Sequence, residues 1–131
     1  MQVYLVRHAE AASGEPDELR SLTPAGREVA RALGEQLAAD GVRPDAILTS
    51  PLLRARETGA AVGRGVGVEA EPDERLAPGA TADDLRAVVA GRGEIVVVVG
   101  HQPDCGQIYA ALTGEPEPKF RAGGMQKLEL P

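Results

Sequence analysis

Apolar and polar residues form two kinds of pattern along this chain. Residues 3–6, 46–48 and 95–99 are short, continuously apolar and rich in β-branched side chains. Continuous apolar runs of this length are typical of strands that are covered on both faces, as in a parallel sheet. Residues 126–130 alternate polar and apolar positions, which predicts a strand at or near a sheet edge. A further short strand is predicted around residues 66–70.

The segments between these strands carry the start and stop signals of helices. Such signals include Ser or Thr at an N-cap, proline at the first helical position and glycine after the last turn. In the first helix Val29, Leu33 and Leu37 recur every four residues, so we expect these side chains to face the core. The predicted helices span residues 24–40, 51–62, 82–90 and 104–114.

The order of these elements predicts an α/β protein. Strands and helices alternate, which indicates a three-layer α/β/α sandwich with a mostly parallel central sheet. The glycine- and proline-rich stretches at residues 11–18 and 115–124 are interpreted as surface loops rather than linkers. The chain has 131 residues, of which 43% are hydrophobic, and we expect residues 1–131 to form a single domain.

Charge and cysteine content narrow the classes of function. Lys and Arg total 14 and Asp and Glu total 20, a formal charge of -6 that disfavours binding to nucleic acids and to anionic membranes. The single cysteine, Cys105, excludes an intramolecular disulfide and is interpreted as a buried thiol, with a place in a ligand pocket as the alternative. The longest purely apolar run, residues 95–99, is too short to span a bilayer, so we expect a cytoplasmic protein. Its oligomeric state stays open.

Two histidines and two arginines follow the three buried strands. Arg7 and His8 come directly after the first strand. Arg54 lies in the first turn of the helix after the second strand, and His101 follows the third. Each has a structural alternative, since a histidine can be a hydrogen-bonded loop residue and Arg54 can pair with Glu57 on its own helix. Because open α/β sheets bind ligands at the carboxyl ends of their strands, we expect the four side chains to share one site.

A cluster of cations in an acidic protein indicates a bound dianion. Neighbouring cations repel each other unless an anion lies between them. Phosphate fits best, because the arginine fork matches its oxygens in pairs and helix N-termini direct N–H groups at it. We expect Ser50, at the same sheet edge, to help bind the substrate. The chain has no phosphate-binding glycine motif and no clustered metal ligands, so we expect no cofactor and no metal ion. A neutral histidine is then left as the nucleophile toward phosphorus.

Four segments resemble the landmarks of the histidine phosphatase superfamily, also called the phosphoglycerate mutase-like superfamily. They are residues 7–9 (Arg-His-Ala), 22–27, 50–58 and 99–103. Ala9 stands where the commonest signature has glycine, and alanine occurs in the SixA-type phosphohistidine phosphatases, the compact branch that the short chain resembles. The resemblance implies that His8 becomes phosphorylated and that Arg7, Arg54 and His101 complete the phosphate pocket.

The resemblance does not extend to a proton donor. Relatives that act on alcohol phosphates carry a glutamate between the second helix and the late strand, and residues 72–85 lack the usual glutamate motif. Glu74 is the candidate general acid, whereas Asp73 and Asp83 are interpreted as loop or capping carboxylates. Because an alkoxide needs a proton to leave phosphorus more than an imidazole does, the gap favours protein phosphohistidine as the substrate.

Two other functions remain open at this point. One is a phosphatase for small phosphomonoesters that uses Glu74 or Asp83 as general acid. The other is a non-catalytic module that binds phosphorylated partners. The two histidines favour an enzyme, because a module that only binds phosphate needs no nucleophile.

Overall fold

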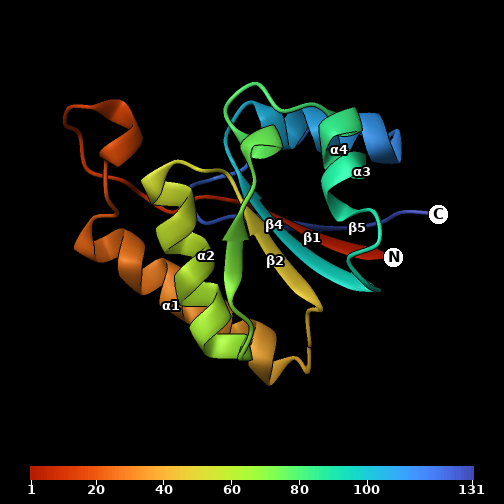
Figure 1. Cartoon of the computed structure of the whole chain (residues 1–131), viewed down its shortest axis with the longest axis horizontal. Coiled ribbons are helices and arrows are strands. Elements are labelled where there is room, and N and C mark those ends of the chain that lie inside the picture. The colour runs from red at the N-terminus through yellow and green to blue at the C-terminus, as the bar shows by residue number, and fades with distance from the viewer.

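The computed structural model describes residues 1–131 and contains a five-stranded sheet at its centre (Figure 1). The strands are β1 (Gln2–Arg7), β2 (Ala46–Thr49), β3 (Ala70–Pro72), β4 (Ile95–Gly100) and β5 (Met125–Glu129). They lie side by side in the order β3-β2-β4-β1-β5. Only β5 is antiparallel, against β1, so the sheet is mostly parallel with an antiparallel edge strand, as the sequence predicts.

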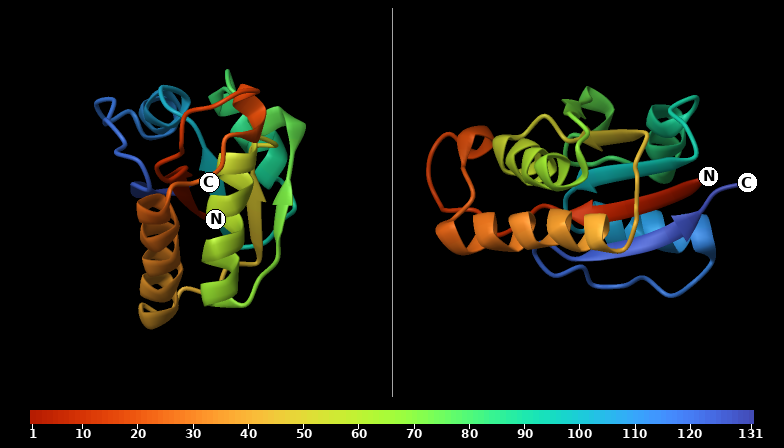
Figure 2. Two further views of the ribbon diagram at one scale, coloured as in Figure 1. Left: turned by 90° about the vertical axis from the view of Figure 1, so that its left-hand side faces the viewer. Right: turned by 90° about the horizontal axis from the view of Figure 1, so that it is seen from below.

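Helices cover both faces of this sheet (Figures 1 and 2). The helices are α1 (Pro24–Ala39), α2 (Leu53–Val66), α3 (Ala82–Val89) and α4 (Asp104–Thr113), with short 3-10 turns η1 (Asp17–Leu19) and η2 (Glu74–Leu76). The pair α1 and α2 packs on one face, and the pair α3 and α4 packs on the other. This arrangement confirms the predicted three-layer sandwich. None of the helices has both the length and the apolar character that crossing a bilayer requires.

The continuously apolar strands are explained by burial on both faces. In β4, Val96 and Val98 join the core under α3 and α4, whereas Val97 and Val99 join the core under α1 and α2. Successive side chains of a strand point to opposite faces, so a strand covered on both sides needs an apolar residue at every position. The two chain ends meet beside the sheet, where the Met1 amino group donates a hydrogen bond to the Leu130 carbonyl over 3.1 Å.

The predicted caps of three helices are present. The Thr23 hydroxyl accepts a hydrogen bond from the Gly26 amide over 2.9 Å, directly before Pro24. Thr81 and Asp84 form a reciprocal capping box at the start of α3. At the end of α4, Gly114 adopts the left-handed conformation with φ 75°, which glycine occupies without steric cost.

Both predicted ends of helix α2 and the predicted position of one strand were wrong. Helix α2 begins at Leu53 rather than at residue 51, because the Ser50 hydroxyl accepts the Leu52 amide hydrogen bond over 3.2 Å and holds the chain in a turn first. The same helix runs on to Val66, four residues beyond the predicted end. Since the helix takes up those residues, the strand predicted at residues 66–70 forms later, as β3.

The predicted core face of α1 was partly wrong. Leu37 is buried, but Val29 is 45% exposed. The face that meets α2 consists of small residues, and an added Cβ on Gly34 would lie 3.0 Å from the Ala61 carbonyl oxygen. Close approach of the two helices therefore selects glycine and alanine there, which an apolar repeat does not reveal. Figure 2 shows α1 and α2 side by side along their length.

Candidate active site

The two histidines meet at the carboxyl ends of β1 and β4. These strands are parallel neighbours with Arg7 opposite Gly100, so the next residue of each strand lies at the same edge. The His8 amide donates a hydrogen bond to the Gly100 carbonyl over 3.0 Å. The rings of His8 and His101 lie with their centroids 5.2 Å apart, at an interplanar angle of 61°. The structure therefore brings these two of the four expected side chains together.

Backbone contacts determine which nitrogen of His8 is free. Its Nδ1 lies 2.7 Å from the Ala9 carbonyl oxygen. A carbonyl oxygen only accepts hydrogen bonds, so Nδ1 carries the proton and Nε2 keeps a lone pair. Burial lowers the pKa of His8 below its ordinary value, and the charges of Arg54 and Arg7 lower it further, against the opposing effect of the Ala9 hydrogen bond. The ring is thus neutral near neutral pH, as a nucleophile must be.

Arg7 lies beside His8 and has one N–H group without a partner in the protein. Its Nη1 donates a hydrogen bond to the Phe120 carbonyl over 2.9 Å. Its Nε is buried and has no hydrogen-bond partner in the protein. A buried unpaired donor costs roughly 1–3 kcal/mol, and a charged donor costs more. The positive charge of this guanidinium acts on His8, and a charge in that position suits an oxyanion.

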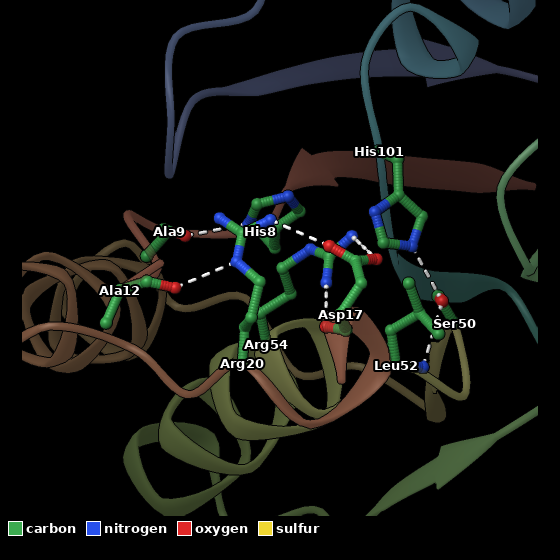
Figure 3. A network of polar contacts seen from close by, with 9 residues as sticks. All are labelled: His8, Ala9, Ala12, Asp17, Arg20, Ser50, Leu52, Arg54 and His101. Carbon is green, nitrogen blue, oxygen red and sulfur yellow. Dashed lines mark hydrogen bonds and ion pairs between the residues drawn. The ribbon is translucent and has the colours of Figure 1, made fainter. Parts of the chain in front are cut away.

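Arg54 reaches the site from the first turn of α2 and is buried. Its partner is Asp17 of η1 and not Glu57, the structural alternative considered from the sequence. The Nη1 atom donates to the Asp17 main-chain oxygen over 3.0 Å, and Nη2 lies 3.3 Å from Oδ2 of the same residue (Figure 3). Glu57 instead accepts a hydrogen bond from the Leu22 amide over 2.8 Å.

Asp17 belongs to a segment that the sequence analysis interpreted only as a surface loop. We call residues 9–22, which follow His8 and include η1, the strap. The Nη1 atom of Arg20, also in the strap, lies 3.0 Å from Oδ1 of Asp17. The only signal in the sequence is an acid and a base three residues apart, which is too common to identify a site. Asp17 and Arg20 are thus site residues that sequence reasoning missed.

Ser50 does not take the position that the sequence analysis expects, in direct contact with the substrate. Its side chain is fully buried, and its hydroxyl lies 2.7 Å from Nε2 of His101. The same hydroxyl accepts a hydrogen bond from the Leu52 amide, which fixes its position against that nitrogen. The other ring nitrogen of His101, Nδ1, faces the side of the site that holds His8 (Figure 3). Ser50 therefore orients His101, because burial removes it from the substrate.

Thr58 joins the backbone behind His8 to the helix that carries Arg54. Its hydroxyl accepts a hydrogen bond from the Ala9 amide over 3.0 Å and donates one to the Arg54 carbonyl over 2.8 Å. Both Thr58 and Ala9 are fully buried. The hydroxyl thereby fixes the backbone beside His8 relative to α2, at a position that sequence reasoning did not assign to the site.

Comparison with known proteins identifies the family. The family model described as the histidine phosphatase superfamily (branch 1) matches residues 3–78, more than half of the chain. This chain belongs to the histidine phosphatase superfamily. The protein named phosphohistidine phosphatase SixA of Escherichia coli (strain K12) is 31% identical over 138 residues, a match that covers 99% of this chain and 86% of that protein.

Solved structures of the superfamily share this fold. A structure of the protein histidine phosphatase SixA complexed with tungstate matches at a TM-score of 0.89 and 29% identity, over 99% of this chain and 88% of that one. A protein of Agrobacterium tumefaciens, provisionally named phosphohistidine phosphatase SixA, matches at 0.84 and 30% identity, over 98% and 90%. These matches confirm the family and the fold that the sequence motifs indicate.

The candidate acids make no hydrogen bond or ion pair with the histidines of this superfamily member. Glu74 is exposed on η2, beside a shallow surface hollow that Pro51 and Arg56 also border. Asp73 caps η2 and lies 2.8 Å from Nη2 of Arg75. The Asp83 side chain is 94% exposed on α3. No hydrogen bond or ion pair joins these three carboxylates to the site, which agrees with the capping and loop roles considered for Asp73 and Asp83.

Two further groups bear on the chemistry. Cys105 lies in the core under α3 and α4, where burial raises the pKa of its thiol to about 12. It therefore anchors α4 and stays protonated, in line with the buried thiol that the sequence favours over a pocket residue. The structure contains no group of three or more His, Cys, Asp or Glu side chains arranged to hold a metal ion.

Burial of His101 predicts a loss of stability in acid. Burial, with a smaller effect of His8, lowers the pKa of His101 from 6.5 to about 4. Between these values the unfolded chain binds a proton that the folded chain does not, so the free energy of unfolding falls as the pH decreases. Allowing for solvent screening, we expect a loss of roughly 1–2 kcal/mol.

Urea unfolding at about pH 7 and about pH 5 measures this loss. The matched variant is His101→Asn, which keeps a polar side chain that does not titrate. We expect the variant to lose less stability between the two pH values than the wild type. Equal losses would show that His101 does not contribute.

Proposed function

We propose that this protein is a metal-independent phosphatase that forms a covalent phosphohistidine at His8 and acts on protein phosphohistidine. The observation that carries the proposal is the free Nε2 lone pair of His8, in a ring that the charges of Arg54 and Arg7 act on and that lies against the ring of His101. One nucleophile and three phosphate-binding side chains are what phosphoryl transfer through an enzyme-bound intermediate needs.

The reaction has two steps with a simple proton balance. In the first, the Nε2 lone pair of His8 attacks phosphorus, and the bond from phosphorus to the leaving atom breaks with its electron pair. The Nδ1 proton stays on His8 throughout, hydrogen-bonded to the Ala9 carbonyl oxygen. In the second, water attacks phosphorus, the bond to Nε2 breaks, and both water protons leave with the phosphate. Arg7, Arg54 and His101 stabilise the charge of the transferring group in both steps.

The substrate class rests on two observations. The similar proteins of Escherichia coli and Agrobacterium tumefaciens carry the name phosphohistidine phosphatase, and tungstate, a tetrahedral oxyanion, is the ligand in the SixA complex. In this chain no carboxylic acid is hydrogen-bonded to the histidines, and Glu74 is exposed. A site of this kind favours a leaving group that needs no proton from the enzyme. An alkoxide does need one.

Substrate competition tests the proposal. The purified protein is assayed with a phosphohistidine-bearing protein, an alkyl phosphate and an aryl phosphate, each with and without a metal chelator. We expect kcat/KM for phosphohistidine to exceed that for the alkyl phosphate by about 100-fold or more, without any effect of the chelator.

The alternatives predict different results in the same assay. Faster hydrolysis of the alkyl phosphate, lost in Glu74→Gln, would support the phosphatase for small phosphomonoesters. Phosphate binding without turnover of any substrate would support the non-catalytic binding module.

A further inference from the structure

A carboxylate lies at a site whose other side chains are two arginines and two neutral histidines. The Asp17 side chain is 60% exposed, whereas that of Arg54, which it contacts, is 9% exposed. One carboxylate oxygen faces Arg20 and the other faces Arg54 (Figure 3). A carboxylate can accept about four hydrogen bonds, so each oxygen retains a free position. Asp17 therefore lies on the solvent side of the buried Arg54, close enough to His101 for its charge to act on that ring.

This carboxylate is ionised and does not donate a proton. The hydrogen bond from Arg20 is the largest effect that lowers the pKa of Asp17, and Arg54 adds to it. Asp17 is consequently not a replacement for the general acid that the site lacks. It can only accept a hydrogen bond from whatever occupies the mouth of the site.

Phosphohistidine poses a specific problem of proton balance. A phosphorylated imidazole ring has a second nitrogen, away from phosphorus. If that nitrogen carries a proton, breaking the P–N bond releases a neutral imidazole; if it does not, the ring must leave as an imidazolate, which is a far poorer leaving group. The protonated ring is cationic, so a nearby carboxylate stabilises it and raises the pKa of the ring.

We infer that Asp17 is a specificity-determining residue that accepts a hydrogen bond from the protonated second nitrogen of a bound phosphohistidine ring. The inference rests on the proposed function. During the transfer the P–N bond breaks, its electron pair returns to the ring, and the proton beside Asp17 remains there. The leaving group is then neutral imidazole, and no proton has to come from the enzyme.

The same carboxylate disfavours alcohol phosphates. A developing alkoxide is negative and has no proton to offer Asp17, so the two groups repel each other. An aryl phosphate releases a stable phenolate and is less sensitive to either effect. This role explains why a carboxylate lies against an arginine of an anion-binding pocket. A site that only bound phosphate would gain nothing from that carboxylate.

The test compares Asp17→Asn with Glu18→Gln, a matched loss of one charge at the exposed next residue of η1. Phosphohistidine and p-nitrophenyl phosphate are the two substrates. For Asp17→Asn we expect kcat/KM with phosphohistidine to fall about 10–30-fold and that with the aryl phosphate to change less than about 3-fold. The alkaline limb of kcat for phosphohistidine should move down by about one pH unit, because the ring loses its proton more easily.

Further results decide between this role and a purely structural one. Asp17→Glu should restore most of the phosphohistidine activity, and Glu18→Gln should change neither substrate. Equal losses with both substrates and an unmoved alkaline limb would overturn the inference, because Asp17 would then only hold the strap on Arg54. Failure of the wild-type protein to hydrolyse phosphohistidine would instead overturn the proposed function, and this inference with it.

Discussion

We expect His8→Ala to abolish turnover of every phosphate substrate, with a loss of at least about 10⁴-fold in kcat. His8 Nε2 is the lone pair that faces the phosphate-binding side chains, and alanine removes it without changing the cations. His101 cannot replace it, because its Nε2 contacts the buried Ser50 hydroxyl. Rapid-quench mass spectrometry with phosphoramidate as donor measures the covalent adduct, which should form on the wild-type protein and be absent from the variant.

His101→Asn is the matched control for this experiment, since it removes the other imidazole. We expect slower turnover from this variant but a phosphate adduct that still forms on His8. An adduct on another residue of His8→Ala, or turnover close to the wild-type rate, would contradict the assignment of the nucleophile. The comparison also separates loss of chemistry from loss of fold, because both variants remove one imidazole from the same site.

The second large effect is expected for Arg7→Lys, which keeps the charge but removes the planar fork. We expect kcat/KM to fall roughly 100–1,000-fold for both phosphohistidine and aryl phosphate. The guanidinium donates to the Phe120 carbonyl from Nη1 and carries its other N–H groups on separate nitrogens, whereas lysine has all its N–H groups on one nitrogen. Steady-state kinetics on the two substrates gives the loss for each.

Arg121→Lys provides the matched substitution for Arg7. Arg121 is exposed in the loop that contains Phe120, and the structure shows no ion pair to its side chain. We expect its activity to stay within about 2-fold of the wild type. A similar small effect at Arg7 would mean that its fork does not bind the transferring phosphoryl group.

Most of the fold was predictable because its signals are local. Strands β1, β2 and β4 are buried on both faces, so each appears as an uninterrupted apolar run. The errors occur where tertiary contacts decide. Whether Val29 is buried depends on how closely α1 approaches α2, and the start of α2 depends on the turn that the buried Ser50 hydroxyl holds.

The site was predictable only where strands deliver its residues. His8, Arg7 and His101 follow parallel strands and Arg54 follows a strand and a turn, so topology alone brings them together. Asp17 lies in the strap, and Thr58 bonds to Ala9 at its start. The sequence of the strap has no periodicity that would indicate where this segment lies. The acceptor for Arg7 is a backbone carbonyl of Phe120, and backbone groups leave no trace in a sequence.

The pairing of Arg7 with Gly100 has a consequence for how this protein can change. The separation of the two imidazoles depends on the spacing of adjacent hydrogen-bonded strands, and no loop length enters into it. Insertions or deletions in the surface loops can therefore alter which substrates fit while the two rings keep their distance. A small chain with this fold can therefore change which substrates it binds while the arrangement of its two histidines stays the same.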